Sequence, residues 1–208
     1  MSQAIGAWAY LGKLARWLRG YRPERATLEH WETSYAAGQW ERLWDADQLA
    51  HYAMVVGYCD LFGATGAILD VGCGDGIVAA RLGHRYRRYV GIDVSREAIR
   101  RAREARGDAE TCFEVGDANT YVPTELFDVV IFNECLYYLD EPSEVVRRYE
   151  AALTPQGVVV VSMYGRDNNQ HVWTELERLH PAVDAVRVQH ASGKVWDVRV
   201  YRPSGAGG

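Results

Sequence analysis

The sequence predicts an α/β fold built on a doubly wound, mostly parallel β-sheet whose last strands form an antiparallel pair. Three observations predict it. From residue 67 to residue 162, short apolar runs alternate with helical stretches. Two of these runs, at 128–132 and 158–162, are apolar at nearly every position, which is typical of parallel strands buried on both faces. Near the C-terminus, two β-rich runs flank Ala-Ser-Gly-Lys, the signal of a hairpin.

Each expected element follows from a local pattern. The apolar, β-branched runs give strands at 68–71, 89–92, 111–115, 127–132 and 158–162, and the terminal hairpin pairs 183–190 with 195–201. Helical periodicity gives helices at 77–83, 96–106, 142–153 and near 172–179. Thr-Pro-Gln-Gly at 154–157 is expected to stop the third of these helices. Residues 204–208 are expected to form a frayed tail.

The N-terminal part, residues 1–62, is expected to form a helical cap or lid beside a main domain at 63–208. Residues 4–20 carry apolar side chains at helical spacing, with Lys13, Arg16 and Arg19 largely on another face. This helix would either make a weak contact with an anionic membrane surface or dock on the domain. A second helical region at 28–62 is rich in Trp and Tyr and is broken at Gly38.

Composition excludes several classes of protein. The chain has 208 residues and a formal net charge of −5, so a chain-wide basic surface is missing and nucleic acid is not the expected partner. The four cysteines form no CxxC pair, which argues against a disulfide framework or a zinc knuckle. No run of about 18 uncharged apolar residues occurs, and the start of the chain lacks a signal-peptide pattern. We therefore expect a cytoplasmic protein.

The densest motif is the run Ile-Leu-Asp-Val-Gly-Cys-Gly-Asp-Gly at 68–76, a buried strand that enters a glycine-rich turn. Glycine suits such a turn because a Cβ would block a ligand that approaches the backbone. The spacing is G-x-G-x-G, and Ile77 occupies the place of the third glycine of a dinucleotide fingerprint. Asp70, just before the turn, suits a ligand with an ammonium group better than a pyrophosphate, whose charge it would repel.

Polar residues also follow the next three predicted strands. Asp93 ends the second strand, where a carboxylate can accept both hydroxyls of a ribose. Asp117 follows the third strand, and Asn133 follows the fourth. Parallel strands bring their carboxyl ends to one edge of the sheet, where ligands bind in this architecture. The sequence therefore predicts a ligand site at this edge.

Taken together, DVGCGDG, VGID, GDA, FDVVIFNECLYYL and GVVVVSMYG resemble the successive motifs of class I S-adenosylmethionine-dependent methyltransferases. The resemblance covers roughly residues 66–202. It implies a Rossmann-like, seven-stranded sheet with an antiparallel last strand, and it makes residues 63–208 an S-adenosylmethionine-binding core. The ECLYYL stretch is similar to that of bacterial small-molecule N- and O-methyltransferases, including the nodulation-factor N-methyltransferases. The implied activity is methyl transfer to an oxygen or nitrogen atom of a small molecule, such as a sugar or a natural-product intermediate.

The resemblance also implies roles for individual residues. The cofactor site would comprise Asp70, Gly72, Cys73, Gly74, Asp93, Val94, Asp117, Ala118 and Asn133. The first turn and Asn133 would hold the methionine part, Asp93 the ribose, and Asp117 with Ala118 the adenine. Three residues also have simpler interpretations: Asp117 as an ordinary turn, Asp75 as the N-cap of the next helix, and Cys73 as a small loop residue.

The acceptor would lie beside the methionine end of the cofactor. The candidate catalytic groups are Glu134, Tyr138 and His171, because a hydroxyl acceptor must lose its proton during transfer. The candidate substrate contacts are Trp31, Tyr35, Tyr137 and Tyr164. The aromatic residues of the N-terminal part, with Trp40 and Trp44 included, fit a lid over the site and fit simple helix packing equally well.

Other functions fit parts of the pattern. An NAD(P)-dependent oxidoreductase also has a glycine-rich turn after its first strand and an acid after its second. The glycine spacing, Asp70 and the terminal hairpin argue against that function here. A protein of the same fold can bind S-adenosylmethionine and yet catalyse a different reaction, or serve as a non-catalytic partner. Glu134 with Asp167 and Asn168 could imitate the magnesium ligands of catechol-type methyltransferases. The rest of that signature is absent from the sequence, so no metal is expected. The oligomeric state is left open.

Overall fold

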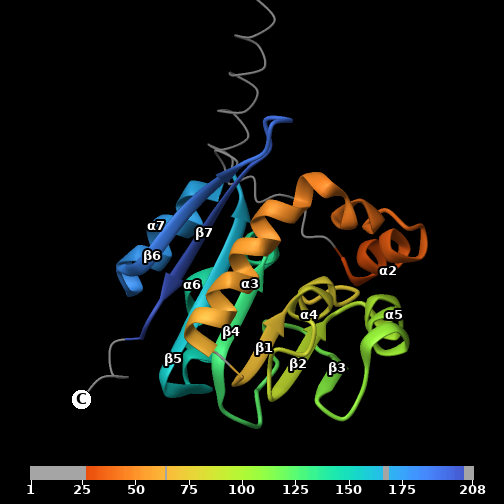
Figure 1. Ribbon diagram of the computed structural model, residues 1–208, viewed down its shortest axis with the longest axis horizontal. Coiled ribbons are helices and arrows are strands. Elements are labelled where there is room, and N and C mark those ends of the chain that lie inside the picture. The colour runs from red at the N-terminus through yellow and green to blue at the C-terminus, as the bar shows by residue number, and fades with distance from the viewer. Residues whose placement is uncertain (1–26, 64, 166–168, 204–208) are drawn as a thin grey trace, which may run out of the picture.

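The computed structural model describes residues 27–63, 65–165 and 169–203, which form a twisted sheet with helices on both faces (Figure 1). Among these residues the sheet has seven strands, in the order β3-β2-β1-β4-β5-β7-β6. In chain order they are β1 (Ala67–Val71), β2 (Arg88–Asp93), β3 (Thr111–Val115), β4 (Phe127–Asn133), β5 (Leu153–Tyr164), β6 (Ala182–Gln189) and β7 (Val195–Tyr201).

The pairing of the strands confirms the predicted fold class. β1 lies between β2 and β4 and is parallel to both. β3 and β5 extend this parallel set on its two sides. β7 pairs antiparallel with β5 and with β6, so the terminal hairpin joins the sheet as an antiparallel pair.

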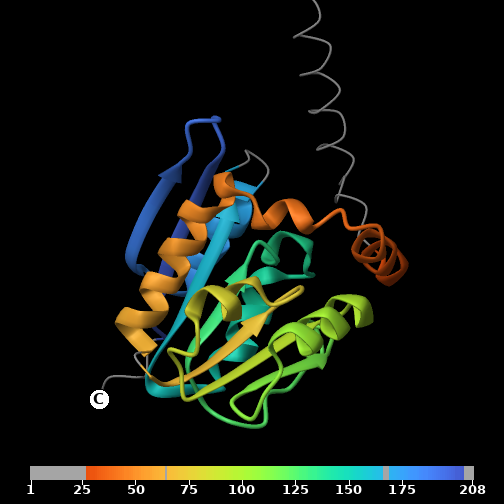
Figure 2. The same cartoon turned by 45° about the vertical axis from the view of Figure 1, so that its right-hand side comes forward.

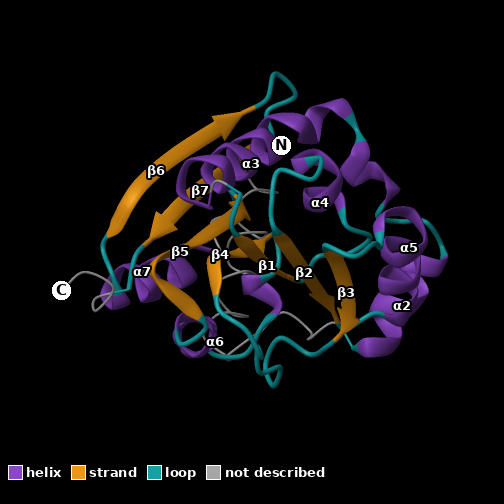
Figure 3. Ribbon diagram, turned by 60° about the horizontal axis from the view of Figure 1, so that its bottom comes forward, coloured by secondary structure: helices purple, strands orange, loops and turns teal. Residues whose placement is uncertain are grey.

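Helices cover both faces of the sheet (Figure 3). α3 (Leu49–Gly63), α4 (Ile77–Leu82) and α5 (Arg96–Arg106) pack on one face, and α6 (Pro142–Glu150) and α7 (Gln170–Leu179) pack on the other. Successive residues of a strand point to opposite faces of the sheet. Ile68 packs in the core under α3, α4 and α5, and Leu69 packs in the core under α6 and α7. This double burial explains why the central strands are apolar at nearly every position. None of the helices that the structure describes is long and apolar enough to cross a membrane.

Local signals explain where two of the helices begin or end. Ser95 caps α5, because its Oγ accepts a hydrogen bond from the N–H of Ala98 at 3.2 Å. α5 then spans the predicted residues 96–106. α4 ends at Leu82, and Gly83 follows it with a φ of 56°, the left-handed conformation that favours glycine after a helix.

The boundary between α6 and β5 differs from the prediction. The helix ends at Glu150, and residues 154–157 belong to the start of β5 instead of stopping a helix. Leu153 pairs with Phe127, and the register then shifts before Val129. The Pro and Gly of this segment are tolerated because an irregular strand start already lacks regular ladder hydrogen bonds.

The described N-terminal segment holds α2 (Leu28–Ala36), the 3-10 turns η1 (Glu41–Trp44) and η2 (Ala46–Gln48), and then α3. The predicted break at Gly38 is confirmed by its φ of 70°. α2 lies beside α5 (Figures 1 and 2), whereas α3 packs on β4, β5 and β7. The division of the chain after residue 62 stays a prediction. The helix predicted at 4–20 and the tail predicted at 204–208 lie outside the described residues.

Phe132→Ala tests the apolar core on the α6 face. The Phe132 side chain is fully buried and meets Tyr149 edge-on at 5.4 Å between ring centres. Its truncation leaves a cavity, so we expect the free energy of unfolding to fall by about 3–5 kcal/mol in urea denaturation. The control is Val122→Ala, at a side chain that is 71% exposed, which should change stability by less than about 0.5 kcal/mol. Equal stability of the two variants would contradict this account of the core.

Candidate cofactor and acceptor site

The glycine-rich turn after β1 is held against β2 by its own backbone. The N–H groups of Gly72 and Cys73 both donate to the carbonyl oxygen of Ile92, at 2.8 and 2.9 Å. Gly72, Gly74 and Gly76 have φ values of 74°, 56° and 83°. Side chains with a Cβ rarely adopt such values, so the path of the turn requires glycine.

At two of these positions, close neighbours are a second reason why the turn requires glycine. A Cβ on Gly72 would lie 2.7 Å from the Cβ of Cys135. A Cβ on Gly74 would lie 2.6 Å from the hydroxyl oxygen of Tyr35, so this phenol reaches the turn from α2. The Cys73 side chain is buried within the core, as expected for a small loop residue.

Asp75 does not cap α4, so that interpretation of the sequence was wrong. The N-cap position belongs to Gly76, which makes no side-chain cap hydrogen bond. The Asp75 carboxylate instead accepts a hydrogen bond from Nε1 of Trp44 at 3.1 Å, and its carbonyl oxygen accepts one from Arg106 at 2.9 Å. The Arg106 guanidinium also lies 4.8 Å from the centre of the Trp44 ring. Trp44 thus ties the N-terminal segment to the turn.

Asp93, at the end of β2, bridges the turn and the start of α5. Its Oδ2 accepts the N–H of Gly74 at 3.0 Å, and its Oδ1 accepts the N–H of Ser95 at 2.9 Å. Burial raises the pKa of Asp93 to about 6, although these two hydrogen bonds act in the opposite direction. The carboxylate is therefore held at Gly74, where a ligand of the turn would meet it.

Asp70 lies more deeply, near the carboxyl end of β1. Its side chain is 1% exposed, and its Oδ2 accepts the hydroxyl of Tyr89 at 2.5 Å. Its Oδ1 is buried and has no hydrogen-bond partner among the described residues. Burial raises the pKa of Asp70 to about 7; the Tyr89 hydrogen bond opposes this rise and the charge of Asp93 adds to it.

Two polar residues stand at the end of β4. Oδ1 of Asn133 is a second buried oxygen to which no group in the described part of the chain donates a hydrogen bond. Glu134 has a φ of 58°, an uncommon and strained value for a residue with a Cβ. Its carboxylate accepts the hydroxyl of Tyr137 at 3.0 Å and that of Ser162 at 3.4 Å. The Glu134 carboxylate is thereby held between β5 and the 3-10 turn η3 (Leu136–Tyr138).

Aromatic side chains of the N-terminal segment meet those of η3. The ring centres of Trp31 and Tyr138 are 4.9 Å apart, and those of Trp31 and Trp40 are 5.6 Å apart. Tyr35 lies 6.0 Å from Trp40, and Tyr137 lies 4.5 Å from Tyr138. The fold thus joins four residues that the sequence assigned to the acceptor side, although they come from distant parts of the chain: Trp31, Tyr35, Tyr137 and Tyr138.

The residues predicted near the adenine lie at the end of β3. Asp117 is exposed, and its Oδ1 accepts the N–H of Asn119 at 2.9 Å, which is the ordinary turn that the sequence also allowed. The carbonyl oxygen of Ala118 accepts the hydroxyl of Tyr149 at 3.1 Å. Val94 is half-buried next to Asp93 in the chain. These positions leave the Asp117 carboxylate open to solvent.

The other predicted site residues belong to β5 and α7. The Tyr164 ring meets Trp196 edge-on at 5.4 Å. His171 is exposed in the first turn of α7. The described residues contain no group of three His, Cys, Asp or Glu side chains that could hold a metal ion. Asp167 and Asn168 lie outside them, so the magnesium alternative is untested.

Glu32 of α2 is a residue that the sequence analysis missed. Its carboxylate accepts the N–H groups of Arg96 and Glu97, at 2.8 and 3.1 Å, and the hydroxyl of Ser95 at 3.1 Å. These donors form the start of α5, where free N–H groups and the helix dipole favour an anion. Burial works to raise the pKa of Glu32, but the three hydrogen bonds prevail and lower it. The sequence does not show which distant helix a single acidic residue will cap.

The sheet order and the glycine turn followed by Asp93 are those of the class I methyltransferase fold. Residues 69–161 match the family model described as a methyltransferase domain. An uncharacterized methyltransferase of Mycobacterium tuberculosis (strain H37Rv) is 33% identical over 98 residues, which are 47% of this chain and 50% of that protein. The ubiquinone biosynthesis O-methyltransferase of Neisseria meningitidis serogroup A is 30% identical over 149 residues, 68% of this chain and 60% of that protein. The chain thus spans about half the length of the first of these relatives.

Solved structures share the fold. The N-methyltransferase NodS from Bradyrhizobium japonicum WM9, in complex with S-adenosyl-L-homocysteine, matches with a TM-score of 0.71 at 21% identity. The match covers 83% of this chain and 98% of that one. The cyclase SpnF matches with a TM-score of 0.62 at 18% identity, over 77% of this chain and 82% of that one. At these identities the likeness establishes the fold alone.

S-adenosylmethionine is the cofactor of this class of domain, and the residues at the carboxyl edge fit it. The partnerless oxygens of Asp70 and Asn133 would accept hydrogen bonds from an ammonium group. The absence of a Cβ at Gly74 lets a ligand approach the backbone where the Tyr35 hydroxyl already does. Asp93 lies at the same place with both carboxylate oxygens able to accept further hydrogen bonds.

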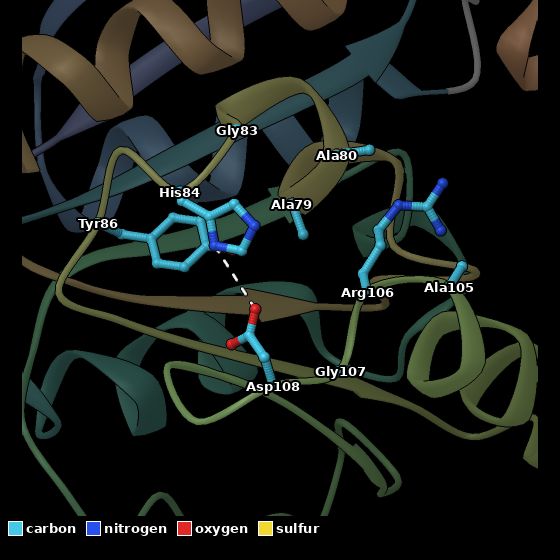
Figure 4. A pocket seen from close by; sticks show the side chains of 9 residues that line it. All are labelled: Ala79, Ala80, Gly83, His84, Tyr86, Ala105, Arg106, Gly107 and Asp108. Carbon is cyan, nitrogen blue, oxygen red and sulfur yellow. Dashed lines mark ion pairs between the residues drawn. The ribbon is translucent and has the colours of Figure 1, made fainter.

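A groove of about 300 Å³ lies away from this site (Figure 4). It is lined by residues at the ends of α4 and α5, including Gly83 and Arg106, and by His84, whose Nδ1 is 3.5 Å from the Asp108 carboxylate. Both helices start at the carboxyl edge and run back toward the amino edge of the sheet. The groove therefore lies behind the glycine turn, and Arg106, which lines it, also donates a hydrogen bond to Asp75 of the turn.

Glu32→Ala should loosen α2 from α5. The variant loses three hydrogen bonds to the start of α5, but Ser95 still caps that helix, so stability should fall by only about 1–2 kcal/mol. Limited digestion with trypsin should then cut faster after Arg42, which is exposed in the N-terminal segment. Glu29→Ala removes the same charge from an exposed position of α2 and is the control. Equal cleavage rates in the two variants would show that Glu32 does not hold the segment.

Proposed function

We propose that the protein transfers a methyl group from S-adenosylmethionine to an oxygen or nitrogen atom of a small molecule. The observation that carries this proposal is the set of polar groups around the glycine turn. The Asp93 carboxylate lies at Gly74, and Oδ1 of Asp70 and Oδ1 of Asn133 are buried with no hydrogen-bond partner in the residues that the structure describes. A buried oxygen without a partner is costly, and a cationic ligand at this edge would satisfy both. The match of residues 69–161 to the methyltransferase-domain family supports the same function.

The proposed cofactor position follows the order of the strand ends. Its methionine part would lie at Asp70, at the turn that includes Gly72, Cys73 and Gly74, and at Asn133. Its ribose would lie at Asp93 and Val94, and its adenine at Asp117 and Ala118. Tyr35, which the sequence assigned to the acceptor, has its hydroxyl at Gly74. We therefore assign Tyr35 to the methionine part of the cofactor.

The chain's own residues must orient the acceptor and accept its proton. When bound, S-adenosylmethionine supplies a methyl group that its sulfonium already activates. Effective transfer needs the acceptor atom in line behind that methyl group, at about 3 Å, with water excluded. Glu134 is our first candidate for the proton acceptor, because Tyr137 and Ser162 hold its carboxylate at the end of β4. Tyr138, Tyr164 and His171 are the further candidates around the acceptor.

A sugar or a natural-product intermediate is the acceptor class that we propose. Trp31, Trp40 and Tyr138 form an aromatic cluster between the N-terminal segment and η3, and aromatic faces suit the apolar faces of rings. Two similar proteins are named as a ubiquinone biosynthesis O-methyltransferase and as an N-methyltransferase, which supports an oxygen or a nitrogen acceptor without separating them.

The alternative function keeps the fold and the cofactor but changes the chemistry. The similar structure of SpnF belongs to a cyclase, so this fold also serves reactions other than methylation. The test is to incubate the whole chain with S-adenosylmethionine and candidate sugars or metabolite extracts, and to analyse the products by mass spectrometry. Methyl transfer yields S-adenosylhomocysteine together with an acceptor heavier by one CH₂ group. An acceptor converted without that mass gain would support the alternative.

Asp93→Ala tests the cofactor position. The variant loses a carboxylate that we expect to bind the ribose hydroxyls, so affinity for S-adenosylmethionine should fall by about 1.5–3 kcal/mol. Isothermal titration calorimetry measures the change. Asp60→Ala, at an exposed acid of α3 that pairs with Arg85, is the control and should bind like the wild type. Unchanged affinity in a folded Asp93→Ala protein would remove the ribose assignment.

A further inference from the structure

Asp70 is a buried carboxylate that lacks a cationic partner within the described part of the chain. The groups that interact with it electrostatically come from several elements: Tyr89 and Asp93 of β2, Tyr52 and Cys59 of α3, Cys73 of the turn, and Cys135 after β4. All are phenols, thiols or another carboxylate. A buried charge needs a compensating charge or full hydrogen bonding. The described residues supply neither for Oδ1, and a cationic ligand would satisfy this oxygen.

Tyr89 fixes the other oxygen of this carboxylate. The Tyr89 ring is fully buried, with its centre 5.3 Å from that of Tyr86 and 5.8 Å from that of Phe113. Its backbone pairs with Ile68 in the ladder of β1 and β2. The pairing of the two strands therefore fixes the distance from the Tyr89 hydroxyl to Asp70. The hydroxyl donates to Oδ2 at 2.5 Å. A rigid donor thus leaves Oδ1 as the oxygen that remains for a ligand.

We propose that Tyr89 is a positioning residue for the cofactor: by holding Oδ2 of Asp70, its hydroxyl orients the carboxylate so that Oδ1 receives the ammonium group of the methionine part. The inference rests on the proposed function, because it takes S-adenosylmethionine as the ligand. A hydrogen bond donated to a carboxylate also favours its charged form. Tyr89 therefore both aims the Asp70 carboxylate and helps to keep it negative for the ammonium group.

Affinity for a ligand that carries the ammonium group should depend on pH. The Asp70 carboxylate attracts the ammonium group only when it is ionised. Affinity is therefore highest at a pH well above the Asp70 pKa of about 7, and it declines as the pH falls through that value. Tyr89→Phe removes the hydrogen bond that opposes the raised pKa, so the decline should begin at a higher pH. We expect a shift of about one pH unit, which makes the variant roughly tenfold weaker at about pH 6.5 and within about twofold of wild type at about pH 8.5.

The experiment is a calorimetric titration of the whole chain with S-adenosylhomocysteine across this pH range. 5′-Methylthioadenosine is the matched ligand, because it keeps the adenosine and the sulfur but lacks the amino-acid part. Tyr86→Phe is the matched protein control: it removes another buried phenol hydroxyl, one that bonds Oγ1 of Thr111 at 2.9 Å. Tyr89→Phe should weaken S-adenosylhomocysteine at low pH and leave 5′-methylthioadenosine unchanged. Tyr86→Phe should match the wild type with both ligands.

Several results would overturn the inference. A loss by the same factor for both ligands, or by the same factor at every pH, would make Tyr89 a structural residue only. A pH-dependent loss seen with S-adenosylmethionine but not with S-adenosylhomocysteine would place the carboxylate at the sulfonium instead of the ammonium group. A wild-type chain that binds neither compound at any pH would overturn the proposed function itself, and that result needs no variant.

A second variant pair protects the test against misfolding of Tyr89→Phe. Asp70→Asn removes the buried charge, so the double variant with Tyr89→Phe buries no unpaired carboxylate. In the Asp70→Asn background, removal of the Tyr89 hydroxyl should no longer change the pH dependence of S-adenosylhomocysteine binding, because the two residues act as a coupled pair. A pH-dependent effect that persists in this background would overturn the inference.

Discussion

The candidate site depends on the register of β1 between its two parallel neighbours. Val71 pairs with Ile92 of β2 on one side and with Phe132 of β4 on the other. Both neighbours therefore end where β1 gives way to the glycine turn, and the next residues, Asp93 and Asn133, flank that turn. A slip of one residue would move every side chain of a strand to the opposite face. The two buried cores thus fix the register, and the register brings the polar residues together.

The N-terminal segment completes this edge through contacts of a different kind. Glu32 binds the start of α5, and Trp44 binds Asp75 in the turn. Trp31 reaches Tyr138 in η3. These contacts are polar or aromatic and lie at the margin of the domain, whereas α3 is anchored in the apolar core by buried side chains. A segment held in this way opens at a lower free-energy cost than the sheet unfolds.

Most of the fold could be predicted because burial on both faces leaves a strong sequence signal, and β3 and α5 have the predicted bounds. The start of β5 was missed because its Pro and Gly mimic a helix stop, and pairing with β4 reveals the strand only in three dimensions. The strand ends predicted the positions of Asp70 and Asp93, since parallel topology alone places them. Glu32 and Tyr89 could not be assigned, because their partners lie on other elements and a lone acid or tyrosine carries no spacing signal. Asp75 is a residue type that often caps helices, but in the folded chain its carboxylate accepts a hydrogen bond from Trp44 instead.

The effect of a carboxylate at this edge on methyl transfer depends on which positive charge it faces. A carboxylate against the sulfonium would stabilise a charge that transfer removes, and it would thereby raise the barrier. A carboxylate against the ammonium group or the ribose hydroxyls stabilises groups that do not change, and so it serves binding alone. The hydrogen bond from Tyr89 keeps Asp70 beneath the turn, and Gly74 holds Asp93 at the next strand end. In the proposed assignment this leaves Glu134 beside the acceptor, where its charge favours the cation that an attacking amine becomes, or accepts the proton of a hydroxyl.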